Sequence, residues 1–295
     1  MQLTQIPVEF NPIGHTYTDT RTGKPLSGIT STLLHRLFPD KYDGISGRTL
    51  ERAAEHGKEV HTDIDYIESI GTEPETDEGR DYIRLRTENN LQRIASEYLV
   101  SDLQRYASSI DIVFADGEDS VSLADIKTTA ELDRDYVSWQ LSIYKRLFLI
   151  ANPGIKVTHL YAIHLRDGKA RLVEVPEITA TDIDALIQAD TDDKPFHWES
   201  PVPSVIRDSA DEILSLTEEI KAKTARLDLL KKAAMEEMLE SKVKTCDLGT
   251  MRITLREPSE RRTFDAKAFR TDHAELYTQY ERTTQTGASL NITIR

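Results

Sequence analysis

The chain has 295 residues, a length near the roughly 250 to 300 at which a single core stops growing, so we expect one large domain with an appendage, or two domains. Apolar residues make up 38% and charged residues 30%, which excludes wholesale disorder. The single cysteine, Cys246, excludes a disulfide framework and any thiolate-rich zinc or iron–sulfur site formed by this chain alone. Any bound metal ion must therefore use oxygen and imidazole ligands.

The net charge of −14 lies entirely in the first two thirds of the chain, because residues 201–295 carry 16 basic and 16 acidic residues. We interpret the acidic excess as a solvated surface that also supplies metal ligands. The N-terminal residues show no basic flank followed by an apolar run, and no stretch approaches 18 consecutive apolar residues. We therefore expect a cytoplasmic protein without a membrane partner.

The first 45 residues combine turn formers with short apolar runs, which predicts a β-turn region leading into a short helix. Apolar residues then recur every three to four positions, which predicts helices over Gly47–Ser69 and Asp77–Leu99. The period changes to two at Ile110, and the turn at 116–119 separates this run from Val121–Lys127, which predicts a β-hairpin.

Helix and hairpin signals continue to alternate as far as residue 189. We expect a helix over 133–151, a second hairpin over 155–165 and 169–175, and a short helix over 179–189. This order predicts an α/β fold with a central mixed sheet flanked by helices.

Pro195, Pro201 and Pro203 mark a predicted boundary between a core of residues 1–200 and an appendage of residues 204–295. Arg207–Lys244 has near-heptad apolar spacing and predicts one helix about 57 Å long. We expect this helix to complete the core or to contact another chain, and direct DNA binding is the alternative. A strand over 251–255, a capped helix at 272–275 and a strand over 290–294 complete a small α+β appendage.

The first hairpin concentrates charge on one face. If it is symmetric about position 118, Asp111 lies directly opposite Asp125, and side-chain alternation places Lys127 on the same face as Asp125. Two facing carboxylates need a cation or a shared proton, so this face suits a hard divalent ion and an anionic substrate. An exposed hairpin with scattered charges is the alternative.

Two helices carry further polar residues at helical spacing. His61 lies four residues after Gly57 on the predicted inner stripe, where glycine allows another element to approach. Gln140 and Tyr144 lie one turn apart on the apolar face of the next helix. Taken alone, each pair is also compatible with ordinary core packing.

Together these motifs resemble the PD-(D/E)XK nuclease superfamily, in particular its RecB-like and lambda-exonuclease-like phage branch. The resemblance covers about residues 47–165 and depends on the order of five motifs: Gly57–His61, Glu97, Ser109–Val113, Asp125–Thr129 and Gln140–Tyr144. Residues 264–277 also resemble the end of YqaJ-type phage recombination exonucleases. The resemblance implies a restriction-endonuclease-like core in a bacterial or phage-infected cell.

The resemblance also implies roles for individual residues. Asp111, Asp125, the carbonyl of Ile126 and His61 are expected to bind Mg²⁺ or Mn²⁺, and Glu97 supplies another carboxylate. Lys127 is expected to orient or activate the attacking water and to offset charge on the transition state. Gln140 and Tyr144 are expected to position substrate or to support the lysine, and Thr129 is a further substrate-binding candidate. Apart from the resemblance, Arg48, Arg52, Lys58 and Arg84 are candidate phosphate contacts, and a solvated helix residue is the favoured interpretation of each.

The function implied is a metal-dependent deoxyribonuclease, specifically a double-strand DNA exonuclease in phage-type recombination or end processing. Such an enzyme is expected to bind duplex ends, to form a homo-oligomer and to hand single strands to an annealing protein. Two alternatives remain: a nuclease-fold scaffold that binds a partner without turnover, and an endonuclease or nickase on the same core.

Overall fold

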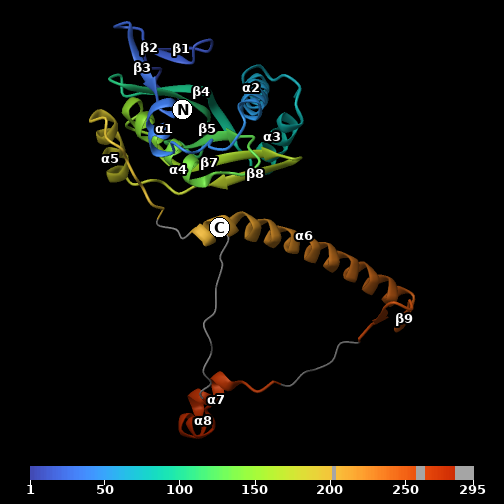
Figure 1. Ribbon diagram of the computed structural model, residues 1–295. Helices are drawn as coiled ribbons and strands as arrows, with labels where there is room; N and C mark the ends of the chain where they lie inside the picture. Colours follow the sequence, from blue (N-terminus) through green and yellow to red (C-terminus); the bar gives the residue numbers. More distant parts are fainter. Residues whose placement is uncertain (201–203, 257–262, 283–295) are drawn as a thin grey trace. The chain divides into compact units, whose positions relative to one another are not determined.

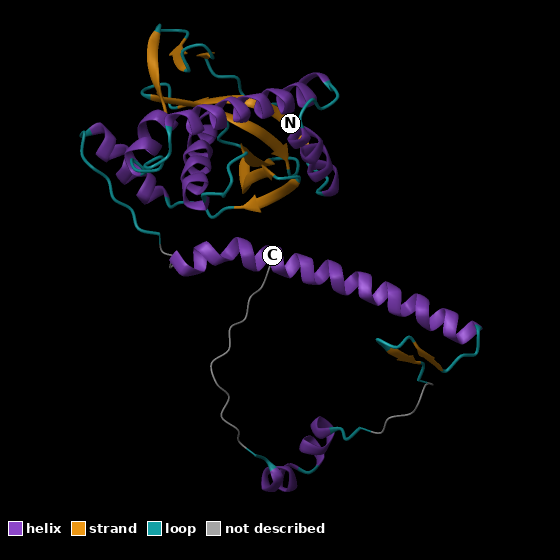
Figure 2. Cartoon of the chain, turned by 45° about the vertical axis from the view of Figure 1, so that its right-hand side comes forward, coloured by secondary structure: helices purple, strands orange, loops and turns teal. Residues whose placement is uncertain are grey.

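The computed structural model describes residues 1–200, 204–256 and 263–282, and the chain separates into two compact units, 1–200 and 201–295 (Figure 1). The first unit is a mixed α/β fold with a central eight-stranded sheet flanked by helices (Figure 2). The predicted fold class, including the long C-terminal helix and the small α+β elements after it, is confirmed.

Eight strands form the sheet of the first unit. Its main path runs β1-β2-β3-β5-β6-β7-β8, and β4 pairs with β5 beside this path. The strands span β1 (Val8–Asn11), β2 (Thr16–Asp19), β3 (Lys24–Gly28), β4 (Gln92–Ser101), β5 (Tyr106–Ala115), β6 (Ser120–Lys127), β7 (Lys156–Arg166) and β8 (Lys169–Glu174). The β3–β5 and β6–β7 pairs are parallel and the other pairs are antiparallel, so the sheet is mixed.

The β5–β6 hairpin has the register that its sequence predicts. Ile112 pairs with Ala124 and Ala115 with Val121, which is the arrangement symmetric about position 118. Pairing ends at Ile112–Ala124, so the expected pair of Asp111 with Asp125 is not formed, although β6 continues along β7 as far as Lys127. The other neighbour on this edge of β5, β3, reaches only Ala107. The edge of β5 around Asp111 is therefore free of strand pairing, and β5 and β6 separate at this point.

Helices cover both faces of the sheet. On one face α4 (Arg134–Ala151) packs with Val121 and Leu123 of β6 around the buried Trp139. On the other face α2 (Gly47–Ile70) and α3 (Asp77–Glu88) pack on Ala124 and Ile126. Residues of β6 therefore alternate between the two layers, as a strand requires. The layer of α4 also contains η1 (Thr30–Leu34), α1 (His35–Leu37) and α5 (Ala180–Thr191).

Local signals explain where the main helices begin and end. Ser46 caps α2 by accepting a hydrogen bond from the Thr49 amide, and Gly71 ends this helix with a left-handed φ of 72°. Asp133 caps α4 in the same way through the Tyr136 amide. Helices over 47–69, 133–151 and 179–189 are therefore confirmed to within a few residues.

Two predictions for the first unit are wrong. The helix expected over Asp77–Leu99 ends at Glu88, and its second half is strand β4. Leu91, Ile94 and Ala95 fit a helical period by chance, and a bulge between Arg93 and Ala95 blurs the two-residue period of the strand. The N-terminal turn region contains three strands of four or five residues, which are too short to give a clear period.

In the second unit, α6 (Ser204–Glu240) is a single 37-residue helix. A small hairpin of β9 (Thr245–Asp247) and β10 (Arg252–Thr254) follows, and then α7 (Ala266–Asp272) and α8 (Ala274–Tyr280). The predicted strand at 251–255 corresponds to β10, whereas β9 was not predicted. The strand predicted over 290–294 lies outside the described residues.

Candidate metal centre and active site

A cluster of potential metal ligands lies around Asp111 of β5, at the level where β5 and β6 separate. His61 of α2, Glu97 of β4 and Asp111 of β5 each offer one ligand atom, and these three atoms lie within 4.8 Å of one another. Ser96 pairs with Ile112 and Tyr98 with Ile110, so the sheet register places Glu97 across from Asp111. Three elements distant in sequence thus bring one imidazole and two carboxylates together.

The separation of β5 and β6 determines how Asp111 is held. The Ile126 amide donates a hydrogen bond to Oδ2 of Asp111 at 2.7 Å, in place of a bond to the backbone of β5. The Ile126 carbonyl lies 3.2 Å from Nε2 of His61. Asp111, Ile126 and His61, three of the predicted ligands, are therefore neighbours.

The hydrogen bond of His61 identifies the ring nitrogen that is available as a ligand. A carbonyl oxygen can only accept, so Nε2 of His61 must carry the proton that it donates to Ile126. Burial lowers the pKa of His61, although the charge of Asp125 opposes this effect, so the ring is neutral. Its unprotonated Nδ1 then faces Oδ2 of Asp111 at 3.6 Å. Two lone pairs that face each other at this distance suit a cation between them.

The electrostatics of the two carboxylates also fit a bound cation. Burial, followed by the neighbouring charge of Asp125, raises the pKa of Asp111 to about 8. Burial and the charge of Asp111 raise the pKa of Glu97 to about 7. Both carboxylates are therefore poorly stabilised by protein groups alone. Carboxylate oxygens are ligands that suit Mg²⁺ and Mn²⁺, and the imidazole nitrogen adds one softer ligand to the set.

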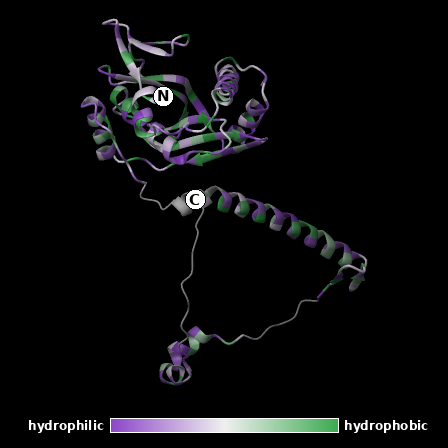
Figure 3. Cartoon of the chain, viewed as in Figure 1, coloured by the Kyte–Doolittle hydropathy of each residue, from purple (hydrophilic) through white to green (hydrophobic). Residues whose placement is uncertain are grey.

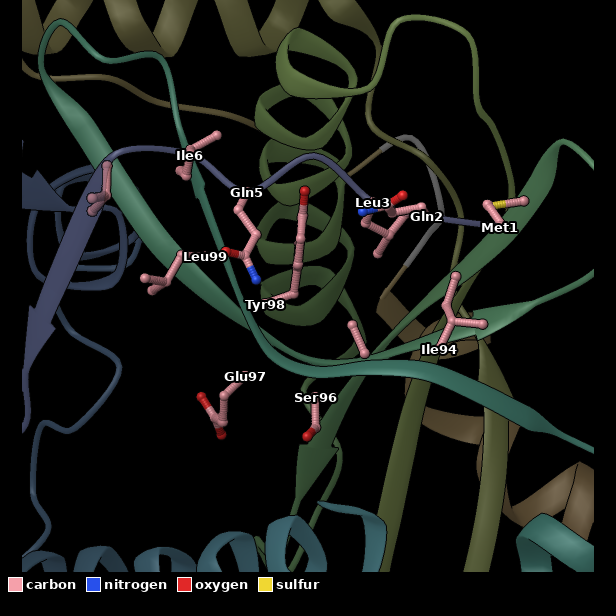
Figure 4. A pocket seen from close by; sticks show the side chains of 12 residues that line it. Met1, Gln2, Leu3, Gln5, Ile6, Ile94, Ser96, Glu97, Tyr98 and Leu99 are labelled. Carbon is pink, nitrogen blue, oxygen red and sulfur yellow. The ribbon is translucent and has the colours of Figure 1, made fainter. Parts of the chain in front are cut away.

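An unusual backbone conformation directs Glu97 into the cluster. Its φ of 44° lies in the left-handed region, which is uncommon for a residue other than glycine. Figure 4 shows Ser96 and Glu97 on one side of β4 and Tyr98 on the other, so the normal alternation of the strand is broken here. Ser96 donates to Asp65 of α2 at 2.7 Å, and Ser109 donates to Glu97 at 2.7 Å.

Asp125 and Lys127 lie beside the cluster, on the side of α4. The Lys127 ammonium contacts Oδ2 of Asp125, which is almost fully buried. Burial alone would lower the pKa of Lys127, but the charges of Asp125 and Asp111 outweigh burial and raise it. Lys127 is therefore an ammonium in this arrangement, able to donate hydrogen bonds and to balance negative charge.

Gln140 of α4 orients both of these charged groups. Its Oε1 accepts from Nζ of Lys127 at 3.1 Å, and its Nε2 donates to Oδ1 of Asp125 at 2.7 Å. The same Nε2 lies 2.7 Å from the Tyr144 hydroxyl, one turn further along the helix. The helical pair noted in the sequence therefore contacts the carboxylate–lysine pair of β6.

The remaining predicted site residues are dispersed. Arg48, Arg52 and Lys58 are exposed on α2, and Arg84 of α3 forms an ion pair with Asp81 at 2.7 Å. Thr129 is exposed just after Lys127, and its carbonyl is hydrogen bonded to Nε2 of the buried His164 at 2.7 Å. The structure brings none of these four cations into the ligand cluster.

Sequence reasoning missed the polar residues that support the cluster. Ser96, Ser109 and Asp65 were not singled out, because residues 77–99 were interpreted as one helix and the pairing of β4 with β5 was not foreseen. His164, which the parallel register places beside Lys127, was also missed. Its Nδ1 lies 2.9 Å from the Arg171 guanidinium, and no motif indicated His164.

A cavity of about 540 Å³ lies between the N-terminal segment and β4 (Figure 4). Leu3, Ile6, Ile94 and Leu99 are among its lining residues, and Glu97 borders it. The Glu97 carboxylate projects to the side of β4 opposite Tyr98 and Gln5, toward α2. The cavity is therefore adjacent to the ligand cluster and does not contain it.

Among the described helices, none is both long enough and apolar enough to cross a membrane. No family model and no curated protein matches the chain. Among solved structures, the chain is similar to the crystal structure of SSO0001, with 14% identity, 56% of this chain and 74% of that chain covered, and a TM-score of 0.34. It is also similar to the crystal structure of LHK-Exo in complex with dAMP, with 14% identity, 66% of this chain and 84% of that chain covered, and a TM-score of 0.27.

Proposed function

We propose that this protein is a Mg²⁺- or Mn²⁺-dependent deoxyribonuclease that shortens duplex DNA from its ends. The proposal depends on one observation, which is that two sets of side chains are adjacent. One set is the ligand cluster of His61, Glu97 and Asp111, and the other is the Asp125–Lys127 pair. Carboxylates and imidazole that bind a divalent ion, next to a fixed ammonium, form the set that hydrolysis of a phosphodiester requires.

His61, Glu97 and Asp111 would hold the ion, with Asp125 next to them. When bound, the ion supplies Lewis acidity, which neutralises phosphate charge and makes water more acidic. The Lys127 ammonium orients the attacking water and offsets the charge that develops on the phosphate. Gln140 keeps this ammonium in place through its hydrogen bonds to both Lys127 and Asp125.

Cleavage from duplex ends is more specific than metal-dependent cleavage of DNA in general. It is supported by the resemblance of the motifs to phage exonucleases. An endonuclease would use the same metal and lysine chemistry, so the two differ in whether closed circles are cut. Transfer of the single strand to an annealing protein would follow end resection and belongs to the same proposal.

The test compares linear duplex, linear single-stranded and covalently closed circular DNA, each with Mg²⁺, Mn²⁺ or EDTA. We expect metal-dependent shortening of linear duplex only, abolished in Asp125→Ala. Glu118→Ala is the matched control, because it removes an exposed carboxylate from the turn of the same hairpin. Cutting of circles would indicate the endonuclease. Absence of cleavage by a folded wild type would favour the partner-binding scaffold.

A further inference from the structure

The long helix α6 carries an exposed apolar stripe. Leu216, Ile220, Leu227 and Leu230 are between 49% and 64% exposed, and together with the half-buried Ile213 they follow heptad spacing along one side of the helix. Figure 3 shows apolar residues recurring along α6. A stripe of this kind is the seam of a coiled coil. Its length from 213 to 230 corresponds to about 27 Å of helix.

The charges along the segment that carries the stripe, residues 212–232, change sign near its middle. Residues 212–219 include three acidic residues and no basic ones, whereas residues 221–232 include five basic residues and one acidic residue. The ion pairs within the helix, such as Lys223–Glu219 at 3.0 Å, are exposed and are worth little on their own. Charges held only by such weak pairs can also interact with charges of a second chain.

We propose that α6 pairs with α6 of a second copy of this chain in antiparallel orientation. Antiparallel pairing about the middle of the segment sets each acidic half against a basic half, twice in one dimer. Parallel pairing would set acidic against acidic and basic against basic. The charge pattern thus selects both the occupant, a second copy, and its direction.

The antiparallel register follows from the stripe. Ile213 of one copy lies in a layer with Leu230 of the other, and Leu216 lies in a layer with Leu227. Glu219 then flanks Arg226 of the second copy, on both sides of the two-fold axis. In each of the two central layers, Ile220 of one copy lies beside Lys223 of the other. A lysine in the seam weakens the dimer but favours this register over others.

Cysteine cross-linking in the full-length chain tests the direction of pairing, with Cys246→Ser as background. We expect a disulfide when the Ile213→Cys and Leu230→Cys chains are mixed, and none when either variant is oxidised alone. Disulfides within each single variant would indicate parallel pairing and overturn the proposal. A wild-type chain that stays monomeric by sedimentation at about 100 times the concentration used for cross-linking would also overturn the proposal, because mass action favours a dimer at higher concentration.

Charge variants test the pairing without engineered cysteines. Glu219→Lys should weaken dimerisation at least about tenfold, and adding Arg226→Glu in the same chain should restore it, because the two positions face each other across the dimer. Lys223→Leu should tighten the dimer, since it removes a charge from the seam. Failure of the charge swap to restore dimerisation in helical, folded protein would contradict the register.

Discussion

At the scale of single residues, the imidazole of His61 is central to the proposed metal centre. Its Nε2 proton is committed to the Ile126 carbonyl, and its Nδ1 lone pair faces Asp111 at 3.6 Å. Outer hydrogen bonds of this kind fix the tautomer and orientation of metal-binding histidines. The ring is thereby oriented as a ligand by the same strand, β6, that carries Asp125 and Lys127.

We predict that Asp111→Asn loses metal binding and keeps the fold. The amide oxygen can still accept from the Ile126 amide, whereas the negative charge that attracts the ion is gone. Mg²⁺ or Mn²⁺ at 100 times its dissociation constant should stabilise the wild type by about 2.7 kcal/mol and the variant much less. Thermal unfolding with metal and with EDTA measures this, and an equal metal effect in both proteins would exclude Asp111 as a ligand.

We predict that Gln140→Leu slows cleavage about 10- to 100-fold, the usual cost of losing a supporting hydrogen-bond partner at a metal site. Leucine has a similar volume but provides no bonds to Lys127, Asp125 or Tyr144. Metal-induced stabilisation should change little, because Gln140 contacts none of the three clustered ligands. Single-turnover cleavage at saturating metal, beside a thermal metal titration, separates the two effects.

At the scale of elements, buried carboxylates attach α2 to its neighbours. Glu68 accepts from the Tyr82 hydroxyl and from Arg86 of α3, both at 2.6 Å, and pairs with Arg93 of β4 at 3.0 Å. Asp63 accepts from the Glu75 and Thr76 amides at 3.0 and 2.9 Å. These contacts fix the orientation of the helix that presents His61.

We predict that Asp63→Asn destabilises the protein by about 1 to 3 kcal/mol near neutral pH, because an amide NH₂ then faces backbone donors. Burial would raise the pKa of Asp63, but hydrogen bonds from Glu75 and Thr76 outweigh it and lower this pKa. Because the pKa of Asp63 is lower in the folded state, its charge stabilises the fold at pH values above the unfolded-state pKa of about 3.9. This stabilisation is lost as the pH falls through the folded-state pKa.

Urea unfolding at several pH values measures this dependence. The difference between wild type and Asp63→Asn should be largest near pH 7 and should narrow below about pH 4. Asp119→Asn, in an exposed turn, is the control and should change stability little at any pH. A difference that is constant with pH would contradict the contribution assigned to the charge.

At the scale of the whole molecule, the apolar core belongs to the first unit. In the described part of the chain, the three clusters of buried apolar residues all lie within residues 1–200. Among the described residues of the second unit, Met238 is the one buried apolar residue. The candidate site is also built only from the first unit. The second unit contributes its exposed helix stripe instead.

We predict that a chain ending at Ser200 folds cooperatively and keeps the metal-dependent thermal shift, since it retains the complete core and ligand cluster. The same chain should be monomeric, because it lacks α6. Calorimetry and sedimentation of this truncated chain beside the full chain test both expectations. A truncated chain that is unfolded would show that the second unit completes the core.

Much of the site was predictable because it depends on short-range pattern. The two-residue period on both sides of a polar turn predicted the register that brings Asp111 and Asp125 to one end of the hairpin. Helical spacing placed Gln140 and Tyr144 on one face of α4. Glu97 was singled out through its place in the motif order, although the element assigned to it was wrong.

The sequence by itself therefore determined most of the periodic elements, the hairpin register, the heptad spacing along α6 and the residue types available for chemistry. Only the tertiary structure decided that β4 is a strand, that Glu97 turns toward α2, and that His61 joins Asp111 beside Ile126. The physical reason is the separation along the sequence between the residues that interact. Periodicity and turn chemistry act over a few residues, whereas the cluster depends on strand pairing and helix packing between segments tens of residues apart.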